Sequence, residues 1–475
     1  MKKLDWANTY NGMHLASWGV VGLLSCFLAL PARADNPSYT IESAVARAMA
    51  QNPEIAIARK KIQAAQGDLT VARSGYLPSV ASTGLFRERQ HQSESRLRNE
   101  DYNASVRLVQ TLYTGGAVPN QVAIARLKLQ KQDLELQAIS NRVAMDVRIA
   151  FNDLLLNRAR IRVWEQSVGV LQEEVKSQQE RFSAGIVGQL NVRRAEVALA
   201  NEQPQLIEAR KQLKNSFLRL SELFGEDPRG DGDSSRFDIA GQLEYHPRHP
   251  DLNGCLARAD VERPEIKARQ KDIEIEDRQA DVDRSEQRPQ VEAFSGYEVY
   301  NERDPDLGRE FNHGYVVGVN ARWHIFDGFA TKGRLQATQA RREAAVQSLE
   351  STRNSVASEV RSAFLDLQQA DQVLESETKN VERADESLEI TKGNLAAGLG
   401  TQLDTLQAAS DVTRTRTTRL SAIYLHNVAL ARLARACAMP PEALAFNPKA
   451  AHDAGNDGSR KAVAEIARPP RRLGQ

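Results

Sequence analysis

The spacing of the apolar positions changes abruptly at one point of the chain, and the same change occurs again further on. In residues 101–113 apolar Ala104, Val106, Leu108 and Leu112 lie on one face, and polar Asn103, Ser105 and Arg107 lie on the other. This alternation ends at Gly115-Gly116. It recurs where Tyr315, Val317, Val319, Ala321, Trp323 and Ile325 alternate with Gly318, Asn320, Arg322 and His324, up to Phe326-Asp327-Gly328. Such alternation predicts a half-exposed strand in each place.

A heptad pattern follows each alternating stretch and predicts a long helix. From Val122 to Phe182, apolar residues recur at spacings of three and four over about nine heptads, which is typical of a coiled coil. We expect a helix over residues 117–183, on the order of 100 Å long, and a second over residues 328–396. A shorter helical segment follows each of them, at 189–224 and 402–437.

The two halves of the chain are copies of each other. The matching segments are NPEI at 52–55 with RPEI at 263–266, Pro78 with Pro289, LYTGG at 112–116 with IFDGF at 325–329, FNDLL at 151–155 with FLDLQ at 364–368, and SAGIVGQLNV at 183–192 with AAGLGTQLDT at 396–405. Because all of them keep one register, they indicate a duplication, and a duplication fixes the architecture.

The duplication divides the chain into a first repeat at 35–224, a linker at 225–253 and a second repeat at 254–445. Each repeat is expected to hold a helix, a hairpin (79–113 or 290–326), a long helix and a shorter helix. The linker is rich in Gly, Pro and Asp. Residues 446–475 lack any regular pattern, and we predict that they are disordered.

The N-terminus has the pattern of a secretory signal peptide, residues 1–34. Lys2 and Lys3 precede a short apolar run, and Ala32-Arg33-Ala34 forms a cleavage site. Cys255 and Cys437 then remain in an oxidising compartment. Two cysteines so far apart in sequence are more often small buried residues than a disulfide, and we expect them to be so here.

Composition and motifs exclude several functions. Lys+Arg 63 against Asp+Glu 62 gives a net charge of +1, which does not favour a nucleic-acid partner. The chain has no phosphate-binding loop and no metalloprotease or hydrolase motif, so we predict that it is no enzyme. His246 and His249 are spaced like metal ligands, but linker histidines are usually exposed. We therefore predict no catalytic residue, no metal and no cofactor.

Four strands with apolar and polar faces suggest part of a membrane barrel. A half-buried soluble sheet would show the same alternation, but the signal peptide and the aromatic strand ends favour the membrane. Four strands cannot close a barrel, and open edges are not tolerated in lipid. A dimer would supply eight strands, a trimer twelve and a tetramer sixteen. A dimer would have too few helices to enclose a bore. The pattern alone does not decide between a trimer and a tetramer.

The order of the elements fixes the topology. Both helices that flank a hairpin lie on the same side of the membrane, so the hairpin tips at 88–100 and 301–311 lie outside the cell. The helical tips at 184–190 and 397–403 lie on the order of 100 Å away, in the periplasm.

Together these features resemble the TolC-type outer membrane factor family. The NPEI and RPEI helix starts, the LYTGG and IFDGF elbows, and the AGIVGQLNV and AGLGTQLDT tips carry the resemblance, which covers residues 39–444. It implies a homotrimer in outer membrane lipid, with a twelve-strand barrel on a twelve-helix periplasmic tunnel. It also implies docking to an inner-membrane ABC transporter through a periplasmic adaptor protein.

The resemblance further implies functional residues at the helical tips. Asp404 matches the first of two carboxylates that close the tunnel, whereas Gln407 stands at the second position. The glycines and leucines that match the adaptor-contacting turns are Gly185, Gly188, Leu190, Gly398, Gly400 and Leu403.

Three functions remain open at this stage. The absence of a lipid-anchor cysteine favours the branch that exports proteins, and the resemblance points to type I secretion of an RTX-type toxin such as cyclolysin. The second interpretation is a duct for small-molecule or drug efflux. The third is a periplasmic coiled-coil adaptor without a pore.

Overall fold

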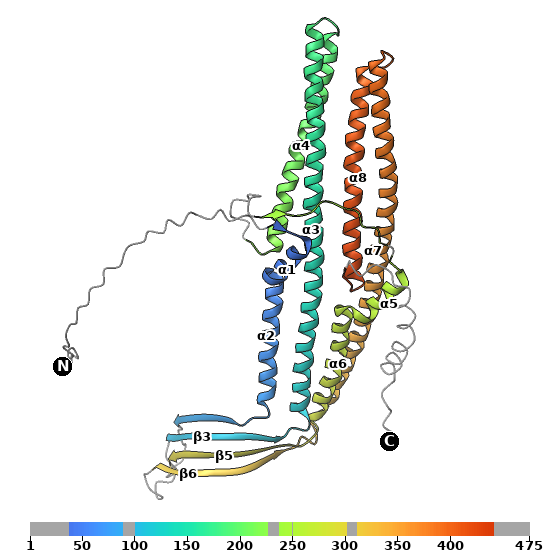
Figure 1. The fold of residues 1–475 in the computed structure, drawn as a ribbon. Coiled ribbons are helices and arrows are strands. Elements are labelled where there is room, and N and C mark those ends of the chain that lie inside the picture. Colours follow the sequence, from blue (N-terminus) through green and yellow to red (C-terminus); the bar gives the residue numbers. More distant parts are fainter. Residues whose placement is uncertain (1–37, 89–99, 227–236, 249, 302–310, 441–475) are drawn as a thin grey trace, which may run out of the picture.

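The computed structural model describes residues 38–88, 100–226, 237–248, 250–301 and 311–440. A four-stranded sheet lies at one end of an elongated molecule, and the helices run from it in one direction (Figure 1). The predicted signal peptide, the predicted tail at 446–475 and most of both hairpin tips lie outside the described residues.

The elements alternate as the duplication predicts. The helices are α1 Ile41–Gln51, α2 Pro53–Ser74, α3 Ala117–Ser183, α4 Gln189–Leu223, α5 Leu252–Glu262, α6 Pro264–Ser285, α7 Ala330–Ala396 and α8 Gln402–Ala436. The strands are β1 Ser38–Tyr39, β2 Ser79–Glu88, β3 Glu100–Tyr113, β4 Asp238–Ile239, β5 Gln290–Asn301 and β6 Phe311–Arg322. The first long helix has the bounds that the heptad pattern predicts.

The large sheet is antiparallel with the order β2-β3-β5-β6. Its register places Ser105 opposite Thr83 on one side and opposite Glu298 on the other. One residue further on, Val106 lies between Ser82 and Tyr297. Residues paired across neighbouring strands point to the same face of the sheet. Most charged side chains therefore lie on one face, and most apolar side chains lie on the other. The alternation in the sequence is thus confirmed as a two-faced sheet.

Some predicted bounds were wrong, each for a local reason. β6 ends at Arg322 rather than at Phe326, because its partner β5 begins at Gln290, opposite Arg322. Helix α7 begins at Ala330 rather than at residue 328, because Gly328 and Phe329 take left-handed backbone angles. The other helix ends shift by a single residue. The linker is not featureless, because it contains β4 and the first residues of α5.

The helices form four columns side by side. Helices α2 and α4 follow one another along one side of α3, and α6 and α8 follow one another along its other side, between α3 and α7 (Figure 1). Buried apolar residues gather in one large cluster for each repeat, at the level where the shorter helices meet. Each long helix is therefore matched by two shorter helices stacked end to end.

The NPEI and RPEI motifs hold these stacked helix ends together. Asn52 caps α2 through the Glu54 amide at 2.9 Å, and its own side-chain amide donates to the Leu223 carbonyl at the end of α4, at 2.9 Å. At the equivalent place Arg263 donates to the Arg435 carbonyl at the end of α8, at 3.0 Å, and to Glu359 at 2.8 Å. Each motif thus satisfies carbonyls that the last helical turn leaves unpaired.

The first strand-to-helix elbow, Thr114–Gly116, is packed against the second repeat. Gly115 has φ +66°, and a Cβ there would lie 2.5 Å from the Ser285 carbonyl oxygen and 2.7 Å from the Arg288 Cβ. The Arg288 guanidinium donates to the Gly115 carbonyl at 2.9 Å. Only glycine allows both the backbone angle and this close approach.

We therefore predict that Gly115→Ala destabilises the chain far more than Gly398→Ala does. Both residues have left-handed φ, which costs alanine roughly 1–2 kcal/mol, but a Cβ at Gly398 meets nothing within 4 Å. Overlap with backbone should add about 1–3 kcal/mol at Gly115. Thermal unfolding of the purified protein measures both, and equal shifts for the two variants would contradict the close packing of the elbow.

Candidate functional site

The helices beyond the level of the linker form two arms. The first arm is the hairpin of α3 and α4, the second arm is the hairpin of α7 and α8, and both end far from the sheet (Figure 1). Their turns contain Gly185 with φ +74° and Gly398 with φ +75°. Leu190 and Leu403, which the sequence singled out, are exposed. The other predicted contact residues, Gly188 and Gly400, lie in the same two turns.

Sequence reasoning missed the most exposed apolar side chains of the tips. Ile186 is 72% exposed and Leu399 is 83% exposed, and the two occupy equivalent positions in the repeats. The sequence could have revealed both residues, because each directly follows the glycine of its turn. An apolar side chain placed on a tight turn at the end of an arm is suited to insertion into a partner.

Asp404 lies in the first turn of α8 and completes a capping box. Its carboxylate accepts hydrogen bonds from the Thr401 amide at 2.9 Å and from the Thr401 hydroxyl at 2.7 Å. These two bonds hold the pKa of Asp404 below its ordinary value, the hydroxyl bond contributing most. Gln407 lies one turn further on, with its amide 3.5 Å from Asp411. Both predicted gate residues are therefore exposed on α8 near the tip.

A ladder of polar contacts joins the two arms along the seam between α3 and α8. Gln402 donates to Glu174 at 3.0 Å, Thr413 to Ser167 at 3.2 Å, and Arg160 to Ser421 at 2.9 Å. The α3 members recur every seven residues, so they lie on one stripe of the helix. This regular polar stripe in the sequence could have revealed the ladder. The prediction from the sequence considered only the heptad positions.

The tip end of the ladder buries polar atoms imperfectly. Gln178 is 3% exposed and Gln402 is 6% exposed, and both donate to the same Glu174 oxygen. The carbonyl oxygens of both glutamines are buried without a hydrogen-bond partner. Unpaired buried oxygens cost free energy. This end of the seam is therefore held less firmly than an apolar contact of the same area.

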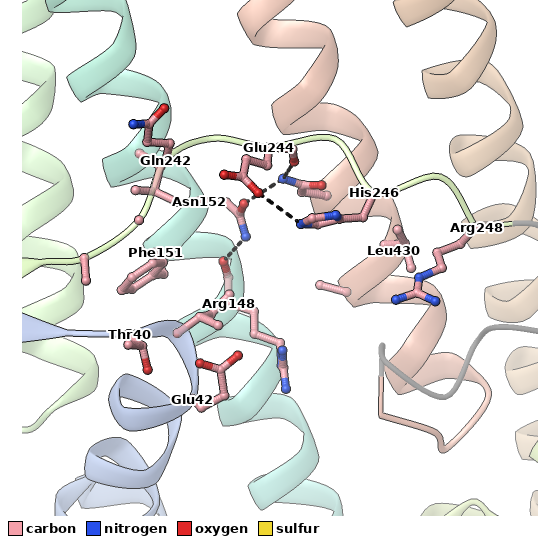
Figure 2. Close-up of a pocket in the computed structure, with 16 residues that line it drawn as sticks. Thr40, Glu42, Arg148, Phe151, Asn152, Gln242, Glu244, His246, Arg248 and Leu430 are labelled. Carbon is pink, nitrogen blue, oxygen red and sulfur yellow. Dashed lines mark hydrogen bonds and ion pairs between the residues drawn. The ribbon is translucent and has the colours of Figure 1, made fainter.

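Residues 237–248 of the linker form a strap that crosses the seam. At one end, Arg158 of α3 donates to the Ile239 carbonyl at 2.8 Å and pairs with Asp238 at 2.5 Å. In the middle, Asn427 of α8 donates both to Asn152 of α3 at 2.9 Å and to the Glu244 carbonyl at 3.1 Å. Figure 2 shows the strap passing from α3 towards α8, with Glu244 and His246 along it.

His426 anchors the other end of the strap. Its ring is fully buried, with Nδ1 2.7 Å from the Asp371 carboxylate on α7 and Nε2 3.1 Å from the His246 carbonyl. The Tyr245 ring packs edge-on against it, with centroids 4.6 Å apart. One side chain thus ties α7, α8 and the strap together.

The strap closes one side of a hollow at the same level. A cavity of about 510 Å³ lies below it, between α1, α3 and α8, with Glu42, Arg148 and Arg248 among its lining (Figure 2). Next to it Ile149 of α3 packs against Val428 and Ala431 of α8 in a small apolar cluster. At this level an apolar cluster and the strap hold the seam together. Between this level and the tips, the seam carries the polar ladder.

The comparisons with known proteins now decide the family. A family model described as outer membrane efflux protein matches residues 44–226 and 255–438, more than half of the chain. The chain belongs to this family. The resemblance that the sequence suggested is thereby confirmed, and the two matched segments correspond to the two repeats.

Individual relatives agree with this family. Protein CyaE of Bordetella pertussis is 24% identical over 397 residues, which are 83% of each chain. The proteases secretion protein PrtF of Dickeya chrysanthemi is 25% identical over 172 residues, but these span only 37% of PrtF and 36% of this chain. The CmeC outer membrane channel of Campylobacter jejuni has a TM-score of 0.71 at 14% identity, covering 89% of this chain and 90% of CmeC. At that identity the likeness shows the fold.

The chain is therefore an outer membrane efflux or secretion channel, a non-enzymatic transport protein whose helices lie in the periplasm. Channels of this family act as trimers, together with adaptors and inner-membrane transporters. Among the described helices, none has a stretch long and apolar enough to cross a membrane.

We predict that the capping by Asp404 is lost in acid. A lowered pKa means that the contribution of this carboxylate is present above the ordinary value of 3.8 and disappears as the pH falls through the lowered pKa. The Thr401 amide donates to this carboxylate, so its exchange, corrected for the intrinsic rate, should rise in that window. In Asp404→Ala it should be fast already at about pH 7, because this amide has lost its acceptor. Gln407→Ala is the control, and an unchanged exchange rate in Asp404→Ala would contradict the capping role.

Proposed function

We propose that three copies of this chain form the exit duct of a type I secretion system and pass an exported protein across the outer membrane. The observation that carries the proposal is a sheet with two open edges, joined to arms that continue its hairpins into the periplasm. Neither β2 nor β6 has a further neighbour within the described part of the chain. Open edges in lipid require partners, and a second copy of the chain can supply them.

The junction between the two repeats suggests how copies would meet. Within one chain, β3 pairs with β5, and α3 packs against α6 and α8. Because the repeats are copies, β6 of one chain can pair with β2 of the next in the same way, and α7 can pack against α2 and α4 of the next. Both edges carry exposed apolar residues for such a contact, Leu77 on the β2 side and Phe326 and Phe329 on the β6 side.

The two faces of the sheet suit a barrel filled with water. The polar face holds Arg107 paired with Glu298 at 3.3 Å, and Asn320 donates to Glu292 at 3.0 Å. The opposite face presents exposed apolar side chains such as Val106, Val317 and Tyr315. Charged residues facing a lumen and apolar residues facing lipid are the arrangement of outer membrane barrels.

The name of PrtF favours a protein as the substrate, and the resemblance noted in the sequence favours an RTX-type toxin. In this proposal the tips at Gly185–Leu190 and Gly398–Leu403 contact the periplasmic adaptor, which links them to an inner-membrane ABC transporter. Asp404 and Gln407 narrow the closed inner end. The duct opens when the second arm moves away from the first and breaks the polar ladder, while the strap keeps the remainder of the seam together.

Small-molecule efflux is the alternative that the family description favours. The two functions need the same duct and differ in the partner and the cargo. A periplasmic rod without a pore is a weaker alternative, because it gives no use to a two-faced sheet with open edges.

In the proposed ring, neighbouring copies meet through the same kind of junction that joins the two repeats. This leads to a prediction about the second strand-to-helix elbow, which contains Gly328. Gly328 has φ +65°, and in a single chain a Cβ there meets nothing within 4 Å. In the ring, Gly328 would approach the end of α2 of the next copy as Gly115 approaches Ser285. Gly328→Ala should therefore leave most of the chain monomeric, while the monomer loses only the roughly 1–2 kcal/mol that its left-handed backbone angle costs, as in Gly398→Ala. Light scattering with detergent correction measures the oligomer, with Gly398→Ala as control. A fully trimeric Gly328→Ala protein would contradict this mode of closure.

The transport function is tested by deleting the gene and measuring secreted protein and drug tolerance in the same cells. We expect a protein to disappear from the medium while tolerance is unchanged, because the duct carries protein. Loss of tolerance with normal secretion would instead establish the efflux alternative.

The same strain tests the opening movement. In Ser167→Cys/Thr413→Cys the two new thiols would replace hydroxyls that lie 3.2 Å apart on α3 and α8, so they can form a disulfide across the seam. We expect this variant to assemble normally and to block secretion until a reductant is added, whereas Ser167→Cys alone secretes normally. Secretion at the normal rate through the oxidised double variant would show that the arms do not separate.

A further inference from the structure

Two cysteines of the second repeat meet in the core, where α5 crosses the end of α8. Cys255 lies in the first turns of α5, and Cys437 is the residue that ends α8. They are 4% and 0% exposed and belong to one buried cluster. Transport as proposed above uses neither of them.

The face of α5 that meets α8 is defined by residues four apart. Cys255, Ala259 and Arg263 follow this spacing, so they lie on one side of the helix. The Arg263 guanidinium donates to the Arg435 carbonyl at 3.0 Å and to the Ala436 carbonyl at 3.4 Å. Ala259 is 1% exposed and belongs to the same buried cluster as both cysteines. The same face therefore directs Cys255 at the end of α8.

In the first repeat the two equivalent positions also lie in one buried cluster. The residues equivalent to Cys255 and Cys437 are Ala44 and Phe224, which share the buried cluster of that repeat. One of these positions has a small side chain and the other a large ring. Both equivalent positions of the second repeat are cysteines.

The two thiols are free in the structure and lie close enough to affect each other's ionisation. The nearby Cys437 thiol lowers the pKa of Cys255. The nearby Cys255 thiol and burial raise the pKa of Cys437. Arg258 favours a thiolate at either cysteine, whereas Asp251 disfavours one at Cys255.

Their spacing in the sequence led us to expect two separate buried thiols, and the structure describes both as free. Because they lie together in an oxidising compartment, we nevertheless propose that Cys255 and Cys437 form a disulfide bond in the mature protein, closing a loop that contains nearly the whole second repeat. Two thiols lose two protons and two electrons, and one S–S bond forms. The oxidant is a dithiol–disulfide oxidoreductase of the periplasm, whose own disulfide takes up the electrons. Its mixed disulfide with Cys255 is resolved when the Cys437 thiolate attacks the Cys255 sulfur and releases the reduced oxidant.

Burial determines when this bond forms and how long it lasts. Both sulfurs are enclosed once α5 has packed on α8, so the oxidant reaches them before that packing is complete. Afterwards the same packing excludes reductants. The bond ties α5 to the end of α8, below the strap, and leaves the arms free to move. Its closed loop spans 182 residues along the chain, counted as 437 − 255, and long closed loops restrict the unfolded chain most.

Thiol labelling of the natural protein tests the proposal without any variant. Trimers are extracted from outer membranes, unfolded in the presence of a maleimide polymer, and separated by size. We expect no label without prior reduction and two labels per chain after it. Two labels in both samples would overturn the proposal. Protein from a strain without the periplasmic disulfide oxidoreductase should carry two labels from the start, and absence of label there would exclude that oxidant.

Stability supplies the second measurement. Addition of a reductant that enters the unfolding protein should lower the apparent melting temperature by roughly 5 °C or more. The double variant Cys255→Ser/Cys437→Ser should melt at the reduced value and should not respond to reductant. Cys255→Ser alone leaves one thiol, which should label fully. Natural protein that melts at the same temperature with and without reductant would contradict a bond in the folded chain.

Discussion

The unpaired backbone groups on the outer edges of β2 and β6 set the main constraint on this molecule. In lipid such groups have no water to bind, and in the proposed ring a copy of the chain pairs with each edge. The duplication provides the geometry for this pairing, because the junction from the first repeat to the second is already formed inside one chain. Gly115 shows how closely that junction is packed, and Gly328 occupies the equivalent place at the edge.

The same helices then have to be rigid near the sheet and movable at the tips. The seam between α3 and α8 meets both demands by changing its chemistry along its length. At the strap, an apolar cluster around Ile149 and the buried ring of His426 hold the columns together. Towards the tips, single hydrogen bonds such as Thr413 to Ser167 replace apolar contact. Polar contacts can exchange partners with water at modest cost, so the proposed separation of the arms would begin at this end.

Periodicity was sufficient to predict the strands, the long helices and the duplication, because each depends on burial that repeats at a fixed spacing. It placed the end of β6 at Phe326, because alternation continues past Arg322 although the partner strand does not. The strap and the polar ladder were not predicted. Their contacts join residues that are distant in sequence, as His426 joins Asp371 and the His246 carbonyl, and no local pattern reveals which carbonyl a buried histidine will meet. The tips were located correctly, but Ile186 and Leu399 were overlooked beside the glycines.

Differences between the two repeats indicate where the second has acquired tasks of its own. Helix α4 begins at Gly188 without a side-chain cap, whereas α8 begins at Thr401 with a complete capping box. The core position of Phe224 has become Cys437, facing a second cysteine. The capping box strengthens α8 at its tip, and the proposed disulfide would strengthen it at its base, each by a local bond that does not cross the seam. A helix reinforced in this way can move as a rigid lever about the strap, which is the property that an arm needs if one partner at its tip is to open the duct.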